Sequence, residues 1–214
     1  MLFRSRTVRP LDTLFFATRD LLDPAAAQYA RAWGAPMAYL YALQQKRMFV
    51  CEKSRQVMMT WVVMAYICWR AKFNEHQLIL VQSKKAEDAQ RLVCTRRGEP
   101  LNARLTLMEA KLPAFLQSIP LNSDRAIKGQ VFYPNASEVW AIPEGGGQIR
   151  SHTPSVYFCD EAAFQPEFSE GYRAALPLIA NGCQGIFVSS AEVGAFQLLV
   201  ESDLDPSHTR VSQN

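Results

Sequence analysis

Four short apolar runs constrain the fold of this chain more than any other feature of its sequence. They are the segments 48–51, 78–81, 156–159 and 185–190. Each has the length of a buried strand and is neighboured by a longer stretch with apolar residues at helical spacing. Buried strands that alternate with helices are typical of βαβ units. The sequence therefore predicts an α/β fold with a mostly parallel sheet.

The segments between these runs predict the remaining elements. We expect helices over 59–72, 84–96, 99–118 and 169–180, with further helices inside 11–46. Pro113 interrupts the third of these helices. Two apolar stretches, 131–133 and 138–142, flank a turn and predict a hairpin. The glycines at 145–147 predict a flexible break, and the polar last ten residues predict a frayed end.

The composition places the chain in an ordinary class and excludes several others. It has 214 residues, of which 49% are hydrophobic and 20% are charged, as in a globular domain. A net charge of +3 is too small to indicate nucleic-acid binding by itself. The five cysteines lack metal-ligand spacing and are expected in the core. The apolar stretch 61–69 is too short to span a bilayer, and no signal peptide is recognisable.

Polar side chains follow three of the four runs. They are found in the segment 52–60, in the pair Asp160 and Glu161, and in the pair Ser189 and Ser190. In open α/β sheets, ligands bind at the carboxyl ends of the strands. Of two adjacent carboxylates at such an end, one can hold Mg²⁺ and the other can activate a water. The alternative for the two acids is a solvated turn.

The segment between the first strand and the following helix has the position of a phosphate-binding loop. It reads Lys53-Ser54-Arg55-Gln56-Val57-Met58-Met59-Thr60. The usual pattern is Gly-x-x-x-x-Gly-Lys-Ser/Thr, of which Thr60 alone matches in the last three positions. Backbone N–H groups at a helix start still favour a phosphate there, and Thr60 can offer its hydroxyl to Mg²⁺.

Two basic residues in this loop can supply the charge that Met59 lacks. We assign Lys53 to phosphate binding in the ground state. The rigid fork of Arg55 suits a bidentate contact to the charge that develops in the transition state. The alternative is that both are ordinary charges of a surface loop.

Taken together, these segments resemble a known family. The stretch Lys-Ser-Arg-Gln-Val-x-x-Thr resembles the variant Walker A loop of large terminase subunits, the DNA-packaging motors of phages. Val-Tyr-Phe-Cys-Asp-Glu-Ala-Ala-Phe resembles their Walker B segment, and Val-Ser-Ser-Ala resembles their coupling motif. The segments 78–84 and 142–153 are also similar. The likeness covers roughly residues 45–195 in the family's order.

This resemblance implies a three-layer, RecA-like P-loop ATPase domain. Residues 1–44 are then a helical extension of that domain and 45–214 its core. The nuclease domain that follows in the family is expected to be absent from this chain. The resemblance also implies that the strand at 185–190 lies between those at 48–51 and 156–159.

The resemblance further implies roles for individual residues. Asp160 and Thr60 hold Mg²⁺, Glu161 activates water, and Ser189 and Ser190 report the loss of the γ-phosphate. A looser likeness places adenine against Tyr41 or Gln44, which otherwise are a core tyrosine and a surface glutamine.

The implied activity is ATP hydrolysis, with ATP and Mg²⁺, that drives double-stranded DNA into a procapsid. The implied partners are the DNA, the portal protein, the small terminase subunit and further copies of the chain in a ring. The expected location is the host cytoplasm, without a membrane. Two alternatives stay open: a non-catalytic nucleotide-binding or scaffold protein, suggested by Met58 and Met59, and a helicase-like ATPase, because Asp-Glu-Ala and Ser-Ser-Ala also resemble helicase motifs.

Overall fold

A computed structural model describes most of the chain from residue 40 onward. The described parts are 40, 43–44, 47–53, 58–96, 102–118 and 125–201, together with the backbone of 208–212. The predicted extension over 1–44 therefore lies almost wholly outside the described residues.

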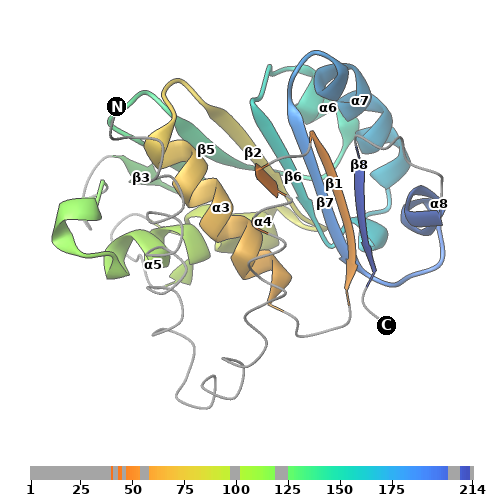
Figure 1. The fold of residues 1–214 in the computed structure, drawn as a ribbon, viewed down its shortest axis with the longest axis horizontal. Coiled ribbons are helices and arrows are strands. Elements are labelled where there is room, and N and C mark those ends of the chain that lie inside the picture. The colour runs from red at the N-terminus through yellow and green to blue at the C-terminus, as the bar shows by residue number, and fades with distance from the viewer. Residues whose placement is uncertain are drawn as a thin grey trace.

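The centre of the described structure is an eight-stranded sheet (Figure 1). Its strands follow the spatial order β3-β4-β5-β2-β6-β7-β1-β8. Their bounds are β1 Met48–Lys53, β2 Leu78–Gln82, β3 Ala126–Ile127, β4 Gln130–Phe132, β5 Glu138–Ile142, β6 Val156–Asp160, β7 Gln184–Ser190 and β8 His208–Ser212. The strands from β5 to β8 in this order pair in parallel, whereas β3, β4 and β5 pair antiparallel.

The predicted position of β7 is confirmed. It pairs in parallel with β1 on one side and with β6 on the other. Lys53 lies opposite Ser190 in the first pairing, and Asp160 lies opposite Val188 in the second. The ends of three strands are therefore brought to one edge of the sheet.

Helices cover both faces of the sheet, which confirms the three-layer α/β fold (Figure 1). On one face lie α3 Met59–Phe73, α4 Ala86–Val93 and α5 Arg104–Lys111. On the other lie α6 Gly146–Arg150, α7 Phe168–Ala180 and α8 Ala195–Glu201. Two short 3₁₀ helices, η3 Ala114–Leu116 and η4 Ala162–Phe164, complete the elements that position the site.

The two faces have separate apolar cores because side chains alternate along each strand. In β1, Phe49 and Cys51 pack toward α3, whereas Met48 and Val50 pack toward α7 and α8. The central strands are thus buried on both sides, which explains their continuous apolar sequences.

Two local expectations are wrong. The glycines 145–147 do not form a flexible break, because α6 begins at Gly146. A Cβ on Gly146 would lie 3.1 Å from the backbone oxygen of Glu170, so glycine lets α6 approach α7 closely. The last ten residues are not frayed throughout, because β8 pairs with the outer edge of β1 and satisfies its backbone groups.

The cysteines lie in the core of the protein. All five cysteines are free and buried, as expected. Burial raises the pKa of Cys51, Cys159 and Cys183 to about 12, so these thiols stay protonated and are poor nucleophiles. Within the described ranges, no helix has both the length and the apolar character needed to cross a membrane.

Candidate nucleotide-binding site

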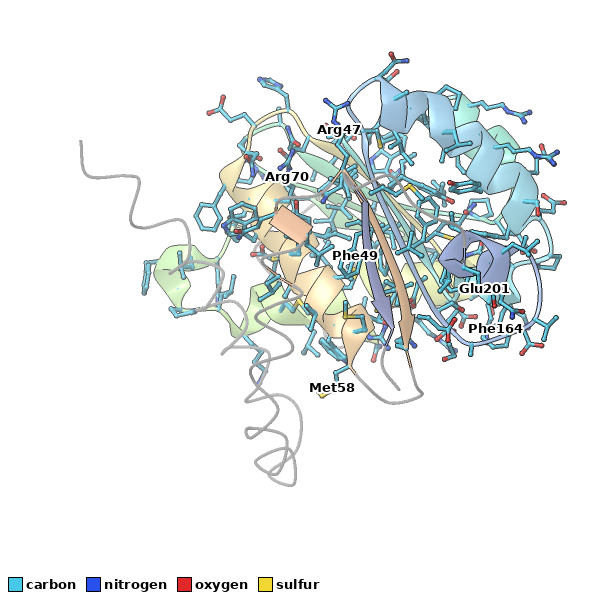
Figure 2. All side chains as sticks on the ribbon, turned by 45° about the vertical axis from the view of Figure 1, so that its right-hand side comes forward. Arg47, Phe49, Met58, Arg70, Phe164 and Glu201 are labelled. Carbon is cyan, nitrogen blue, oxygen red and sulfur yellow. The ribbon has the colours of Figure 1, made fainter. Side chains whose placement is uncertain are left out.

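The candidate site lies at the carboxyl edge of the sheet, where β1 leads toward the start of α3. Figure 2 shows Arg47, which precedes β1, and Met58, which precedes α3, at opposite edges of the molecule. Lys53 ends β1, Asp160 ends β6 and Ser190 ends β7. Because these strands are parallel neighbours, the polar residues at their ends share one edge.

A direct hydrogen bond joins the start of α3 to the end of β6. The Thr60 hydroxyl donates to Asp160 Oδ1 across 3.0 Å, and both side chains are buried. The bond links residues that the sequence predicted as Mg²⁺ ligands and that lie far apart along the chain. It also presents two hard oxygen atoms side by side, as Mg²⁺ requires.

The charge balance around Asp160 also fits a cation. Burial and, to a lesser extent, the charge of Glu161 raise the pKa of Asp160 from 3.8 to about 6. The Thr60 hydrogen bond and the charges of Arg104 and Lys53 oppose these effects without cancelling them. A cation beside Asp160 would stabilise its ionised form. The residues present therefore fit Mg²⁺, which Asp160 and Thr60 would hold.

Glu161, the predicted base, forms an ion pair with Lys53, the predicted phosphate-binding cation. Lys53 Nζ lies 3.2 Å from Glu161 Oε1. Lys53 is buried and Glu161 is half-buried, so the pair is partly shielded from solvent. Glu161 thereby holds the charge of Lys53 in place at the edge where phosphates are expected.

Two residues of the site have a left-handed backbone. Met58 has φ 56°, and Glu161 has φ 51°. Met58 stands where the usual loop has its second glycine, and this conformation explains why glycine is usual there. From this position the Met58 carbonyl accepts hydrogen bonds from the N–H groups of Trp61 and Val62, which begins α3.

The end of β7 is connected to the turn that follows β6. The Ser189 hydroxyl accepts a hydrogen bond from the backbone N–H of Ala163 across 3.1 Å. Ala163 lies in η4, immediately after Glu161 and Ala162. Ser189 is fully buried, and Ser190 is nearly so. A shift of the Glu161 turn would therefore be transmitted to the tip of β7.

Some predicted residues are not placed at this edge. Ser54, Arg55, Gln56, Val57 and Tyr41 lie outside the described residues. Gln44 follows Leu43, whose carbonyl accepts a hydrogen bond from Gln184 at the amino end of β7. Gln44 therefore lies near the amino end of β7, and its predicted contact with adenine stays a prediction.

Two residues near the site were missed by sequence reasoning. Gln165 donates from Nε2 to the Asp160 carbonyl across 3.0 Å and so fixes the end of β6. Arg104 begins α5, and its charge acts on both Asp160 and Glu161. Nothing in the sequence around Arg104 distinguishes it from any other helical arginine, whereas Gln165 could have been noted for following the Walker B-like segment.

Comparison with solved structures identifies the fold. The chain superimposes on the large terminase ATPase domain of Thermus phage P74-26 with a TM-score of 0.50 at 13% identity, covering 78% of this chain and 75% of that one. An arginine-to-alanine variant of that domain gives a TM-score of 0.51 at 12% identity, with 78% and 76% covered. The fold is that of a large terminase ATPase domain. No protein-family model matches the sequence.

The terminase ATPase fold gives the geometry of the edge a context. The sheet is mostly parallel, with helices on both faces, and the polar strand ends meet beside the start of α3. At this level of identity the likeness concerns the fold. The roles of Thr60, Asp160 and Glu161 rest on the contacts described above.

Proposed function

We propose that this chain hydrolyses ATP to move double-stranded DNA, as the motor domain of a phage packaging terminase. The observation that carries the proposal is the hydrogen bond from Thr60 to Asp160, which sits on a terminase ATPase fold. A hydroxyl at a helix start and a carboxylate at a strand end are the side chains that hold Mg²⁺ in P-loop ATPases.

Each residue at the edge has a defined task in this proposal. The start of α3 offers backbone N–H groups to the phosphates, and Lys53 adds a positive charge. Bound Mg²⁺ would offset the negative charge on the β- and γ-phosphate oxygens. Glu161 orients a water toward the γ-phosphorus and accepts its proton as the bond to the leaving β-phosphate oxygen breaks. The products are ADP and inorganic phosphate.

Glu161 must leave Lys53 before it can act as a base. A bound nucleotide would break this ion pair, because its phosphates compete with the Glu161 carboxylate for the Lys53 ammonium group. We therefore propose that nucleotide binding releases Glu161. The hydrogen bond from Ala163 to Ser189 would carry this movement to β7 and on to the DNA-contacting parts.

The proposed setting is a ring of copies in the host cytoplasm. The ring would assemble on the portal protein, and the small terminase subunit would deliver the DNA. These partners are proposed from the resemblance of the sequence to large terminases.

One observation favours a second candidate, a non-catalytic nucleotide-binding protein. Met59 occupies the usual lysine position and is buried in the core, so its side chain contributes nothing to phosphate binding. The same protein would bind ATP without turning it over.

The test is phosphate release by the purified chain with Mg²⁺, with and without linear double-stranded DNA. Glu161→Gln should lower turnover about 100- to 10,000-fold and retain ATP binding. The control is Glu192→Gln, which removes an exposed carboxylate beyond the end of β7 and should leave turnover unchanged.

The outcomes separate the candidates. Hydrolysis stimulated by DNA without strand separation supports packaging, and strand separation would support a helicase-like enzyme. ATP binding without hydrolysis would support the non-catalytic candidate. An unchanged rate in Glu161→Gln would refute the role of Glu161.

A further inference from the structure

A guanidinium group lies beside the candidate site without a role in the proposed chemistry. Arg104 is the first residue of α5, which packs on α3. Its Cζ lies 5.3 Å from the centroid of the Trp61 ring. Trp61 directly follows Thr60 in the first turn of α3. A cation over an indole face is held by the ring quadrupole, so this contact keeps the Arg104 side chain at the site.

Arg104 is partly buried, yet its charge is not matched by a partner. Among the described residues, it has neither an ion pair nor a hydrogen bond, and the ring contact with Trp61 is its one assigned interaction. Burial lowers the pKa of Arg104, whereas the carboxylates of Asp160 and Glu161 raise it. Its N–H donors have no acceptor among the described residues, so they are available to the oxygen atoms of an anionic ligand.

The two acids whose charges act on Arg104 are engaged with other residues. Asp160 Oδ1 accepts the Thr60 hydrogen bond, and Glu161 Oε1 is paired with Lys53. Arg104 is therefore the cation of the described edge that stays free for an anion. Its contact with Trp61, which follows Thr60, places it beside the start of α3, where Mg²⁺ is expected.

We propose that Arg104 contacts the terminal phosphate of a bound nucleoside triphosphate from the α5 side of the site. This inference rests on the proposed ATPase function and adds a residue to it. The guanidinium fork matches two non-bridging oxygens of one phosphate, and its charge adds to that of Lys53 in a site whose helix start has Met59 instead of lysine. Trp61 is then the positioning residue that holds Arg104 beside Thr60.

Such a contact distinguishes a triphosphate from a diphosphate, because ADP lacks the group that Arg104 binds. The experiment measures dissociation constants of the whole chain for ADP and for the non-hydrolysable analogue β,γ-imido ATP, both with Mg²⁺. Arg104→Gln should weaken binding of the analogue about 10- to 100-fold and change ADP binding less than about threefold. Arg104→Lys keeps the charge without the fork. Its affinity for the analogue should lie between those of the unchanged chain and of Arg104→Gln.

The matched control is Arg91→Gln on α4. Arg91 is largely exposed, and its ion pair with Asp88 is a surface contact at 3.5 Å. Removing it should leave both dissociation constants unchanged. Thermal melting followed by circular dichroism checks that every variant is folded. Trp61→Leu is the second variant: it removes the ring but not the cation, and should reduce analogue binding selectively, by a smaller factor of about 3 to 10.

Two results would overturn the inference alone. One is an unchanged ratio of the two dissociation constants in folded Arg104→Gln or, if that variant does not fold, in Trp61→Leu. The other is an equal loss for both nucleotides, which would mean that Arg104 only supports the shape of the site. If the unchanged chain bound neither nucleotide, the proposed ATPase function would fail, and this inference with it.

Discussion

Lys53 Nζ and Glu161 Oε1 lie 3.2 Å apart, across the gap between the end of β1 and the turn after β6. The pair joins two groups that ATP hydrolysis needs separately, a cation for phosphate and a base for water. β7 lies between the strands that carry them. In the proposed mechanism, exchange of this ion pair for a phosphate contact would give the nucleotide a direct way to activate Glu161.

Lys53→Ala should weaken nucleotide binding about 10- to 100-fold, because a buried cation is lost from the phosphate site. Arg55→Ala should instead mainly lower turnover. Titration with a fluorescent ATP analogue and steady-state hydrolysis measure the two effects. Lys128→Ala, which removes an exposed lysine between β3 and β4, serves as the control. Unaltered affinity in Lys53→Ala would make Lys53 an ordinary loop charge.

The left-handed backbone of Met58 predicts that glycine is preferred over alanine at this position. At φ 56°, Met58→Gly should be more stable than Met58→Ala by about 1 kcal/mol, because alanine keeps the Cβ that this conformation disfavours. At an ordinary helical position the order is reversed by a similar amount. Urea unfolding of both variants, with Arg91→Gly and Arg91→Ala as the comparison, tests this. The same order at both positions would contradict it.

Asp160→Asn should stabilise the nucleotide-free protein at neutral pH while abolishing hydrolysis. Folding raises the pKa of Asp160 from 3.8 to about 6, mainly through burial, so the ionised form is disfavoured in the folded state. The contribution of Asp160 to stability is therefore full below the unfolded pKa and is lost as pH rises through the folded one. The free energy of unfolding should increase by about 1–3 kcal/mol at pH 7 in Asp160→Asn.

The measurement is urea unfolding in EDTA, which removes divalent cations, at pH 4 and at pH 7. The gain should be small at pH 4, where Asp160 is largely protonated. Glu192→Gln removes an exposed carboxylate and should show no such gain. Equal stability of Asp160→Asn and the unchanged protein at pH 7 would show that Asp160 is not destabilising.

Ser189→Ala should weaken the stimulation of hydrolysis by DNA while leaving nucleotide affinity within about threefold. The substitution removes the acceptor of the Ala163 N–H and should cost about 1–2 kcal/mol of stability. Ser137→Ala is the matched control, because Ser137 is equally buried and its hydroxyl donates to the Asn74 carbonyl, away from this edge. Stimulation of hydrolysis by DNA should fall in Ser189→Ala and persist in Ser137→Ala. A similar loss in both would indicate an effect of stability alone.

The sheet was predictable because its central strands are buried on both faces. Such strands appear as continuous apolar runs, and the four predicted runs lie within β1, β2, β6 and β7. The proximity of Thr60 and Asp160 was also predictable. Each residue comes after a strand of the parallel sheet, and parallel strands end at the same edge. The order of the strands came from the family resemblance.

Other features depend on tertiary packing and leave no local signal. Arg104 is brought to the site by the packing of α5 on α3, which the helical pattern of 99–118 does not encode. α6 begins among glycines that would predict a break, because contact with α7 selects against a Cβ there. β8 has a polar sequence and pairs because β1 offers a free edge.

Glu161 stands in a conformation for which asparagine, aspartate or glycine is better suited than glutamate. A position governed by folding alone would therefore drift toward one of these residues. A longer acid at this position fits the proposed role of Glu161, which needs both reach and charge. Glu161→Asn should then be more stable than the unchanged protein but inactive, and the turn after β6 would reflect a compromise between folding and chemistry.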